Sequence, residues 1–374
     1  MKSLVYFFLC VWSALALAHK PSDSYLSINI QNNHLSGRWD IALRDLDFAI
    51  GLDDNDDGAI TWGELRSKSQ AINRYVFPRL HLSVSNKACS PQQTDLKVDE
   101  HTDGKYAVLF FDSTCGVTTL QALTVDYRLF ADLDPQHRGL LNLTHDTTSF
   151  AAALVPGKPA RVFGISATRT PWTEAQDFIR EGVWHIWIGF DHILFLFSLL
   201  IPSVMAYESA RWRPVANFRL AFWDVAKVVT AFTLAHSITL SVAVLGFVEL
   251  PSRWVESAIA ASVILAALNN ITPIFTDKRT LLAFTFGLIH GFGFASVLAD
   301  LGLKESSRLW GLLGFNLGVE IGQLALVIVF LPVAYKLSRY PLYKPVVLKS
   351  CSIGIAVLAS LWLFERIFNV SVMV

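Results

Sequence analysis

The sequence has no excess of charge of either sign, because 31 lysine and arginine residues balance 31 aspartate and glutamate residues. Proteins that bind nucleic acid through its phosphates present a net positive field, so this balance argues against nucleic acid as a partner. Charged residues make up only 17% of the chain, against roughly 25% in an average soluble protein. The deficit lies mainly after about residue 180, where long apolar runs begin.

Cysteine is also scarce, with four residues, and they form neither a C-x-x-C motif nor a zinc-type Cys/His spacing. Cys10 lies in the first 18 residues and Cys351 in a late apolar segment. Cys89 and Cys115 both fall in a polar region that we expect to be exported into an oxidising compartment. We predict a disulfide bond between them that stabilises the fold.

The first residues of the chain predict an export signal. A lysine at position 2 is followed by a short apolar core, and Ala16 and Ala18 form an A-x-A cleavage site. An uncleaved membrane helix is the alternative, but the apolar stretch is short for a span, which needs about 20 residues. The expected parts are a signal peptide at residues 1–18, an extracytoplasmic domain at 19–172 and a membrane domain at 173–374.

Polar and apolar residues alternate along much of the extracytoplasmic region, as they do in half-buried strands. Strand-like segments occur at residues 24–30, 79–84, 106–111, 120–129 and 150–154. Turn-forming residues separate these segments. The pattern favours a small β-rich domain, such as a sandwich.

Residues 53–64, DDNDDGAITWGE, interrupt this alternation with the pattern of an EF-hand calcium loop. Such a loop needs oxygen ligands at alternate positions, a glycine at position 6 for a sharp turn, and a glutamate at position 12. Gly58 occupies position 6, and helix-compatible sequence flanks the loop at residues 41–50 and 62–75. The expected Ca²⁺ ligands are Asp53, Asn55, Asp57, the carbonyl of Ala59, Thr61 and Glu64. We predict one EF-hand-like helix-loop-helix with a structural calcium ion; a solvated acidic loop is the alternative.

Long apolar runs in the second half of the chain predict an α-helical membrane bundle of about six transmembrane helices. The runs cover approximately residues 181–203, 224–248, 255–273, 281–300, 309–334 and 346–367. Basic residues follow the first, third and fifth runs: Arg211, Arg213, Arg219, Lys278, Arg279, Lys336, Arg339, Lys344 and Lys349. The positive-inside rule places these loops in the cytoplasm and the N-terminal domain outside, where the export signal also sends it. The expected location is therefore the bacterial inner membrane, with several passes through the lipid bilayer.

Four histidines and two acids lie inside these runs, where a charge is costly unless it has a partner or water. In the first run, His185, Gly189 and His192 are spaced i, i+4, i+7, so we expect them on one helix face with Asp191 beside them. The second and fourth runs contribute His236 and His290. The fifth run contributes Asn316, Glu320 and Gln323 at the same i, i+4, i+7 spacing.

Imidazole nitrogen and carboxylate oxygen together suit a borderline divalent transition metal. A single intramembrane histidine often only joins neighbouring helices by a hydrogen bond. Four of them together with two acids favour a shared ion site over four separate packing contacts.

Three segments of the membrane half also carry a family resemblance. They are His185-x-x-x-Gly189-x-Asp191-His192-x-x-Phe195, the HGFGFA run at His290, and the N-x-x-x-E-x-x-Q run at Asn316. Through these segments the chain resembles the HupE/UreJ family of membrane proteins. The resemblance covers about residues 175–370. The family is regarded as nickel or cobalt permeases associated with hydrogenase and urease maturation. The resemblance implies a transport path lined by His185, Asp191, His192, His236, His290 and Glu320.

Our leading hypothesis is a permease for Ni²⁺ or Co²⁺, driven by a potential or an ion gradient because the sequence has no Walker motif. The first alternative is a membrane-embedded hydrolase in which three histidines hold Zn²⁺ and Asp191 or Glu320 acts as general base. Ser237, next to His236, is a conceivable nucleophile for such an enzyme. In a second alternative, the exported domain binds a protein partner and the helices only anchor it.

Overall fold

The computed structural model describes residues 23–31, 34–84, 87–101, 104–115, 121–134, 137–145, 148–165, 171–209, 211–276, 278–295 and 305–368. The predicted signal peptide lies outside these residues. The described residues fall into two compact units, one of residues 23–173 and 305–308 and one of residues 174–295 and 309–368. Each unit is described by itself.

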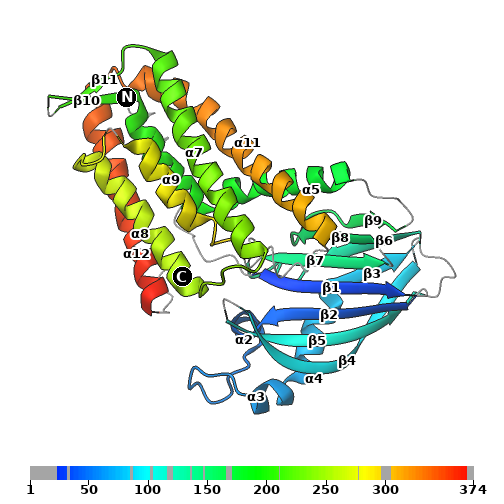
Figure 1. Cartoon of the computed structure of the whole chain (residues 1–374). Coiled ribbons are helices and arrows are strands. Elements are labelled where there is room, and N and C mark those ends of the chain that lie inside the picture. The colour runs from blue at the N-terminus through cyan, green and yellow to red at the C-terminus, as the bar shows by residue number, and fades with distance from the viewer. Residues whose placement is uncertain are drawn as a thin grey trace. The chain divides into compact units, whose positions relative to one another are not determined.

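The first unit is built on a nine-stranded sheet in the order β8-β7-β1-β2-β5-β4-β3-β6-β9 (Figure 1). Its strands are β1 (Asp23–Gln31), β2 (His34–Ala42), β3 (Leu80–Val84), β4 (Lys87–His101), β5 (Gly104–Thr114), β6 (Ala122–Tyr127), β7 (Arg138–His145), β8 (Thr148–Leu154) and β9 (Arg161–Gly164). Strands β1 and β7 pair in parallel, and the other neighbours are antiparallel. The predicted β-rich domain is confirmed.

The sheet curls until it is nearly closed around one core. Strand β4 joins its two parts, because it pairs with β3 at its start and with β5 along the rest of its length. Across the core, the hydroxyl groups of Tyr127 in β6 and Ser24 in β1 lie 2.6 Å apart, and the rings of Tyr127 and Trp39 are 5.7 Å apart. One continuous sheet therefore replaces the two separate sheets of the sandwich that the alternation suggested.

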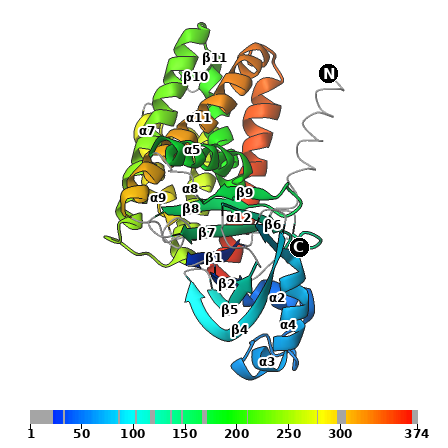
Figure 2. The same cartoon turned by 90° about the vertical axis from the view of Figure 1, so that its right-hand side faces the viewer.

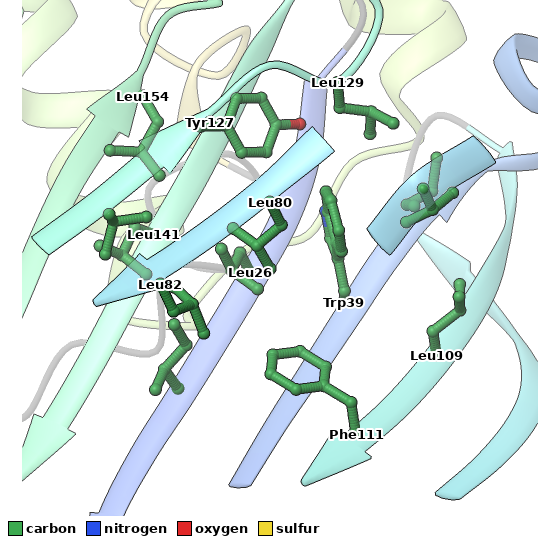
Figure 3. Packing of buried hydrophobic residues seen from close by; sticks show 14 of the residues in the cluster. Leu26, Trp39, Leu80, Leu82, Leu109, Phe111, Tyr127, Leu129, Leu141 and Leu154 are labelled. Carbon is green, nitrogen blue, oxygen red and sulfur yellow. The ribbon is translucent and has the colours of Figure 1, made fainter. Parts of the chain in front are cut away.

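Apolar side chains from both parts of the sheet fill the space inside it. Leu26, Trp39, Leu80, Leu82 and Phe111 are all at most 2% exposed, and they point toward one another between the strands (Figure 3). These residues occupy alternate positions of their strands, as the period of two requires. The core therefore lies where the alternating segments predict it.

A disulfide bond joins Cys89 in β4 to Cys115, the residue after β5. The predicted pairing is thus confirmed. Both cysteines are buried at the edge of the same core. The bond fixes the start of β4 against the end of β5.

Three short helices lie together beside strands β2 and β5 (Figure 2). They are α2 (Leu43–Ile50), α3 (Trp62–Ser67) and α4 (Ser69–Val76). Residues 51–61 connect α2 to α3, and Gly58 within them has φ +79°, a left-handed conformation that glycine adopts without strain. The segment thus connects two short helices, and the EF-hand calcium site predicted there stays a prediction.

Two histidines of this unit contact buried polar groups. His137 is fully buried, and its Nε2 lies 2.6 Å from the hydroxyl of Tyr127. His101 contacts the buried carboxylate of Asp40 at 2.8 Å. Both histidines complete polar contacts that the core would otherwise leave unsatisfied.

The second unit is mainly helical. They are α5 (Pro171–Ile188), α6 (Phe190–Leu200), α7 (Phe218–Val244), α8 (Ser252–Ile271), α9 (Arg279–His290), α11 (Glu305–Leu337) and α12 (Cys351–Phe368). A π-helical turn at Tyr343–Ser350 precedes α12, and a hairpin of β10 (Met205–Glu208) and β11 (Arg211–Pro214) precedes α7. Helices α7 and α9 lie side by side, as do α8 and α12 (Figure 1).

Four helical segments of the described chain are long and apolar enough to cross a membrane: Phe218–Val244, Ser252–Ile271, Arg308–Leu337 and Tyr343–Phe368. A fifth candidate is the pair Ala175–Ile188 and Phe190–Val204, which is bent by 71°. The chain is therefore a multi-pass membrane protein. Of the six predicted spans, the one at 281–300 corresponds to the 12-residue α9 and continues into residues that the structure does not describe.

Candidate functional site

Gly189 interrupts the first predicted span and separates α5 from α6. It has an extended conformation, φ −68° and ψ 100°, and forms the N-terminal cap of α6. A β-carbon at this position would lie 2.7 Å from the carbonyl oxygen of His185, so only glycine fits without a local shift. The bend corrects the prediction that His185, Gly189 and His192 share the face of one straight helix.

The bend nevertheless brings the predicted histidines together. The ring centroids of His185 and His192 are 4.5 Å apart, and those of His192 and His290 are 5.3 Å apart. His236 lies 6.1 Å from His192 and 6.3 Å from His185. One ligand atom from each of Asp191, His192 and His290 lies within 4.8 Å of the other two. Four helices, α5, α6, α7 and α9, thus contribute to one cluster.

The cluster lies inside the helical unit. His192 is 5% exposed, and His236 and His290 are fully buried. Aromatic rings surround them: Phe195 and Phe232 lie 4.9 Å and 5.2 Å from His290. A cation among the buried imidazoles would therefore be held mainly by protein ligands, while the side chain of Asp191, 35% exposed, is a more accessible member of the cluster.

Hydrogen bonds determine which ring nitrogens can bind an ion. His192 Nδ1 lies 3.0 Å from Oδ1 of Asp191. An ionised carboxylate only accepts hydrogen bonds, so Nδ1 carries the proton and Nε2 carries the lone pair. Among the described residues, His192 Nε2 is buried without a hydrogen-bond partner, and neither ring nitrogen of His236 has one.

Glycines allow the helices around the cluster to come close together. A β-carbon on Gly318 of α11 would lie 2.1 Å from the carbonyl of Ile179 in α5, and one on Gly291, just after α9, would lie 2.4 Å from the carbonyl of His236. Small residues at such contacts are typical of membrane helices. They place His185 near α11, where its ring is 5.2 Å from that of Phe315.

The polar residues of α11 form a separate layer rather than part of the cluster. Glu320 accepts a hydrogen bond of 2.7 Å from Thr230, and the side-chain oxygen of Gln323 accepts one of 2.9 Å from Thr233. The amide nitrogen of Asn316 donates to the carbonyl of Leu312, on the same helix. This layer links α11 to α7 on the α7 turns that precede His236.

The hydroxyl of Ser237 bonds to the helix backbone and not to an imidazole that could activate it as a nucleophile. Its hydroxyl donates to the carbonyl of Thr233 at 2.7 Å. A serine nucleophile needs a base within hydrogen-bond reach. The geometry at Ser237 is that of a structural helix serine.

The side chains of the EF-hand-type loop turn toward one another. The carboxylate of Asp53 accepts hydrogen bonds from the backbone N–H groups of Gly58, Asn55 and Asp57. These bonds, that from Gly58 foremost, lower the pKa of Asp53. Glu64 accepts from the N–H and hydroxyl of Thr61, which lowers its pKa as well. Both acids are therefore ionised at neutral pH.

Sequence reasoning missed Ser262 of α8, whose hydroxyl oxygen lies 2.9 Å from His290 Nε2. It also missed Thr230 and Thr233, the partners of the α11 layer. A serine or threonine in an apolar helix has no distinctive spacing, so no sequence signal singles these residues out.

Comparison with known families independently supports the resemblance seen in the membrane half of the sequence. A family profile described as "HupE / UreJ protein" matches residues 163–366. The chain belongs to the HupE/UreJ family. This HupE/UreJ match covers α5 to α12 and therefore includes every member of the histidine cluster. The family is associated with nickel and cobalt transport. Comparison with curated proteins gave no match.

Proposed function

We propose that the chain is a membrane permease for a divalent transition metal ion, nickel or cobalt. The path is lined by His185, Asp191, His192, His236, His290 and Glu320, with Asn316 and Gln323 in secondary positions. The observation that carries the proposal is the meeting of buried imidazoles from α6, α7 and α9 with the carboxylate of Asp191. Imidazole and carboxylate ligands favour Ni²⁺ and Co²⁺ over Mg²⁺ or Ca²⁺, which prefer oxygen alone.

The ion would exchange its water for protein ligands in steps. His192 Nε2, His290 Nδ1 and the nitrogens of His236 are available to replace water molecules, and Asp191 offsets part of the ionic charge. The layer of Glu320 and Gln323 would then offer oxygen ligands between α7 and α11. Because this layer lies on the turns of α7 between His236 and the end proposed to be cytoplasmic, the ion would pass it on leaving the cluster.

The orientation is part of the proposal. The basic loops place the hairpin of β10 and β11 in the cytoplasm and the β-rich domain, residues 19–172, outside. Six spans require residues 281–300 to cross the membrane, with α9 as the described part. Ca²⁺ bound by Asp53, Asn55, Asp57, Ala59, Thr61 and Glu64 would stabilise the outer domain.

Uptake of radioactive nickel into vesicles containing the purified chain tests the proposal. We expect wild-type vesicles to accumulate Ni²⁺, and His192→Ala and His290→Ala to abolish accumulation while the protein still inserts. Ser237→Ala is the matched control, because it removes a polar group from α7 next to His236 but only breaks a bond to the helix backbone. Wild-type uptake by both histidine variants would contradict the proposal, as would tightly retained zinc without any uptake.

A further inference from the structure

Ser262 and His290 form a buried contact between α8 and α9 that constrains the protonation of the imidazole. The Ser262 hydroxyl oxygen is 2.9 Å from His290 Nε2, and it is also 2.7 Å from the carbonyl oxygen of Ile259. Ser262 is 1% exposed and His290 is fully buried. Water is therefore not a competing partner for this bond.

The direction of the two bonds follows from the number of protons available. A carbonyl oxygen only accepts, so the single hydroxyl proton of Ser262 is donated to Ile259. The serine oxygen is then left as an acceptor, and His290 Nε2 must carry the hydrogen. In a neutral imidazole the other nitrogen, Nδ1, holds the lone pair. That nitrogen is buried and has no hydrogen-bond partner in the part of the chain that the structure describes.

His192 has the opposite arrangement. Its Nδ1 donates to Asp191, which leaves Nε2 for an ion. The two rings are 5.3 Å apart and nearly perpendicular, at 83°. One histidine thus offers Nε2 and its neighbour offers Nδ1, each held by a different polar partner.

We propose that Ser262 is a positioning residue that fixes His290 in the Nε2–H tautomer and so makes Nδ1 its metal-binding nitrogen. The inference rests on the proposed permease function for its link to transport, but not for the tautomer itself. Hydrogen bonds to the second nitrogen of a ligating histidine orient the ring, and their loss commonly costs about 10–100-fold in metal affinity. Ser262→Ala would leave Nε2–H unsatisfied and let the ring rotate or change tautomer.

The chain offers a matched control on the same helix. Ser257 of α8 is 8% exposed and donates to the carbonyl of Arg253 at 2.7 Å. It resembles Ser262 in burial and in its backbone bond, and it lies on the helix more than a turn away. Ser257→Ala therefore reports the cost of removing a helix serine, and Ser262→Thr restores the hydroxyl at the position under test.

Two measurements on the full chain in detergent test the proposal. In the first, calorimetric titration with Ni²⁺ should show about 10–100-fold weaker binding for Ser262→Ala, and wild-type affinity for Ser257→Ala and Ser262→Thr. Circular dichroism of the metal-free Ser262→Ala variant should show the helix content of Ser257→Ala, so that weaker binding does not reflect loss of the fold. Unchanged Ni²⁺ affinity in Ser262→Ala would overturn the proposal.

In the second, ¹⁵N NMR of the metal-free, histidine-labelled chain reads the tautomer directly. The signals of His290 are assigned by their loss in His290→Gln. We expect Nδ1 at the shift of an unprotonated ring nitrogen in wild type, and a changed pattern in Ser262→Ala. A protonated Nδ1 in wild type would overturn the proposal. If wild type bound no Ni²⁺ at all, the permease proposal would fail, and this spectrum alone would decide the role of Ser262.

Discussion

Gly189 and His185 lie so close that a β-carbon on Gly189 would stand 2.7 Å from the carbonyl oxygen of His185. The same β-carbon would lie 3.1 Å from both Oδ1 of Asp191 and Nδ1 of His192, the two atoms joined by the hydrogen bond at the start of α6. The bend of the chain and the geometry of the cluster therefore depend on one missing side chain.

Gly189→Ala should consequently impair nickel uptake although it removes no ligand. The methyl group must displace the His185 carbonyl, and the Asp191–His192 pair shifts with it. We expect Ni²⁺ affinity to fall by about tenfold or more, as for other losses of ligand orientation. Calorimetric titration and vesicle uptake measure the effect.

Gly293→Ala is the control for this prediction. Its β-carbon would meet Cδ1 of Ile259 at 2.7 Å, which is the end of a flexible side chain that can move aside. Uptake should stay near the wild-type rate. Equal uptake by Gly189→Ala and Gly293→Ala would show that the close approach at Gly189 does not matter for transport.

Calcium should stabilise the β-rich unit through Glu64. Glu64→Gln removes the charged, bidentate ligand, but glutamine still accepts the bond from the Thr61 N–H that caps α3. We expect Ca²⁺ to raise the unfolding temperature of wild type and to leave Glu64→Gln unchanged. At 100 times the dissociation constant, the free energy of unfolding would rise by about 2.7 kcal/mol.

Scanning calorimetry with calcium and with a chelator measures this shift. Mg²⁺ serves as the control ion, because its strict octahedral geometry suits such a loop poorly. Equal stabilisation of wild type and Glu64→Gln by Ca²⁺ would mean that the ion binds at another site. The loop would then be a solvated acidic loop.

The disulfide should contribute substantially to the stability of the same unit. Cys89 and Cys115 are separated by 26 residues, and closing a loop of that length restricts the unfolded chain by about 3–4 kcal/mol. The double variant Cys89→Ala, Cys115→Ala should lose about this much free energy of unfolding. Pulse proteolysis in urea gives the value, with Cys351→Ala as control; a midpoint equal to wild type would refute the prediction.

Asp40 should make the β-rich unit sensitive to acid. Burial alone would raise the pKa of Asp40, but hydrogen bonds from His101 and Arg38 outweigh it and hold the pKa below its ordinary value. A carboxyl whose pKa is lowered on folding stabilises the protein above its unfolded pKa of about 3.9, and this stability is lost as the pH falls through the folded value.

Wild type should therefore lose stability as the pH falls below about 4, and Asp40→Asn should show a weaker dependence over the same range. Hydrogen exchange of the β1 and β2 amides follows this stability in the full chain. Asp112→Asn, an exposed carboxyl on β5, is the control and should keep the wild-type slope. An identical slope in Asp40→Asn would exclude Asp40 as the source.

Strands were predictable where one face is apolar and not elsewhere. Alternation locates β1 and β5 to within a few residues, because the later half of each strand buries every second side chain, although four consecutive residues are buried earlier in each. Strand β4 is largely exposed and contains Pro91 and several charges, so it has no such pattern. It is a strand because its backbone pairs with β5, the next strand along the chain, and backbone hydrogen bonds leave no periodic trace in the side chains.

The membrane cluster shows the same division. His192, His236 and His290 were identifiable because polar residues in apolar runs are costly and stand out. The reason given for grouping His185 with His192, a shared helix face, was wrong, since the chain bends by 71° between them. Their ring centroids are 4.5 Å apart across the bend, whereas seven residues of straight helix would separate them by about 10.5 Å along the axis.

By itself, the sequence determined the β-rich unit, the apolar helices, the Cys89–Cys115 pair and the residue types able to hold a metal ion. These follow from hydrophobicity, local periodicity and charge, which act over a few neighbouring residues. Only the tertiary structure decided which nitrogen of each histidine is open and that Ser262 touches His290. Those properties depend on contacts between α6, α8 and α9, and the positions of such helices are set by packing over the whole unit rather than by any local pattern.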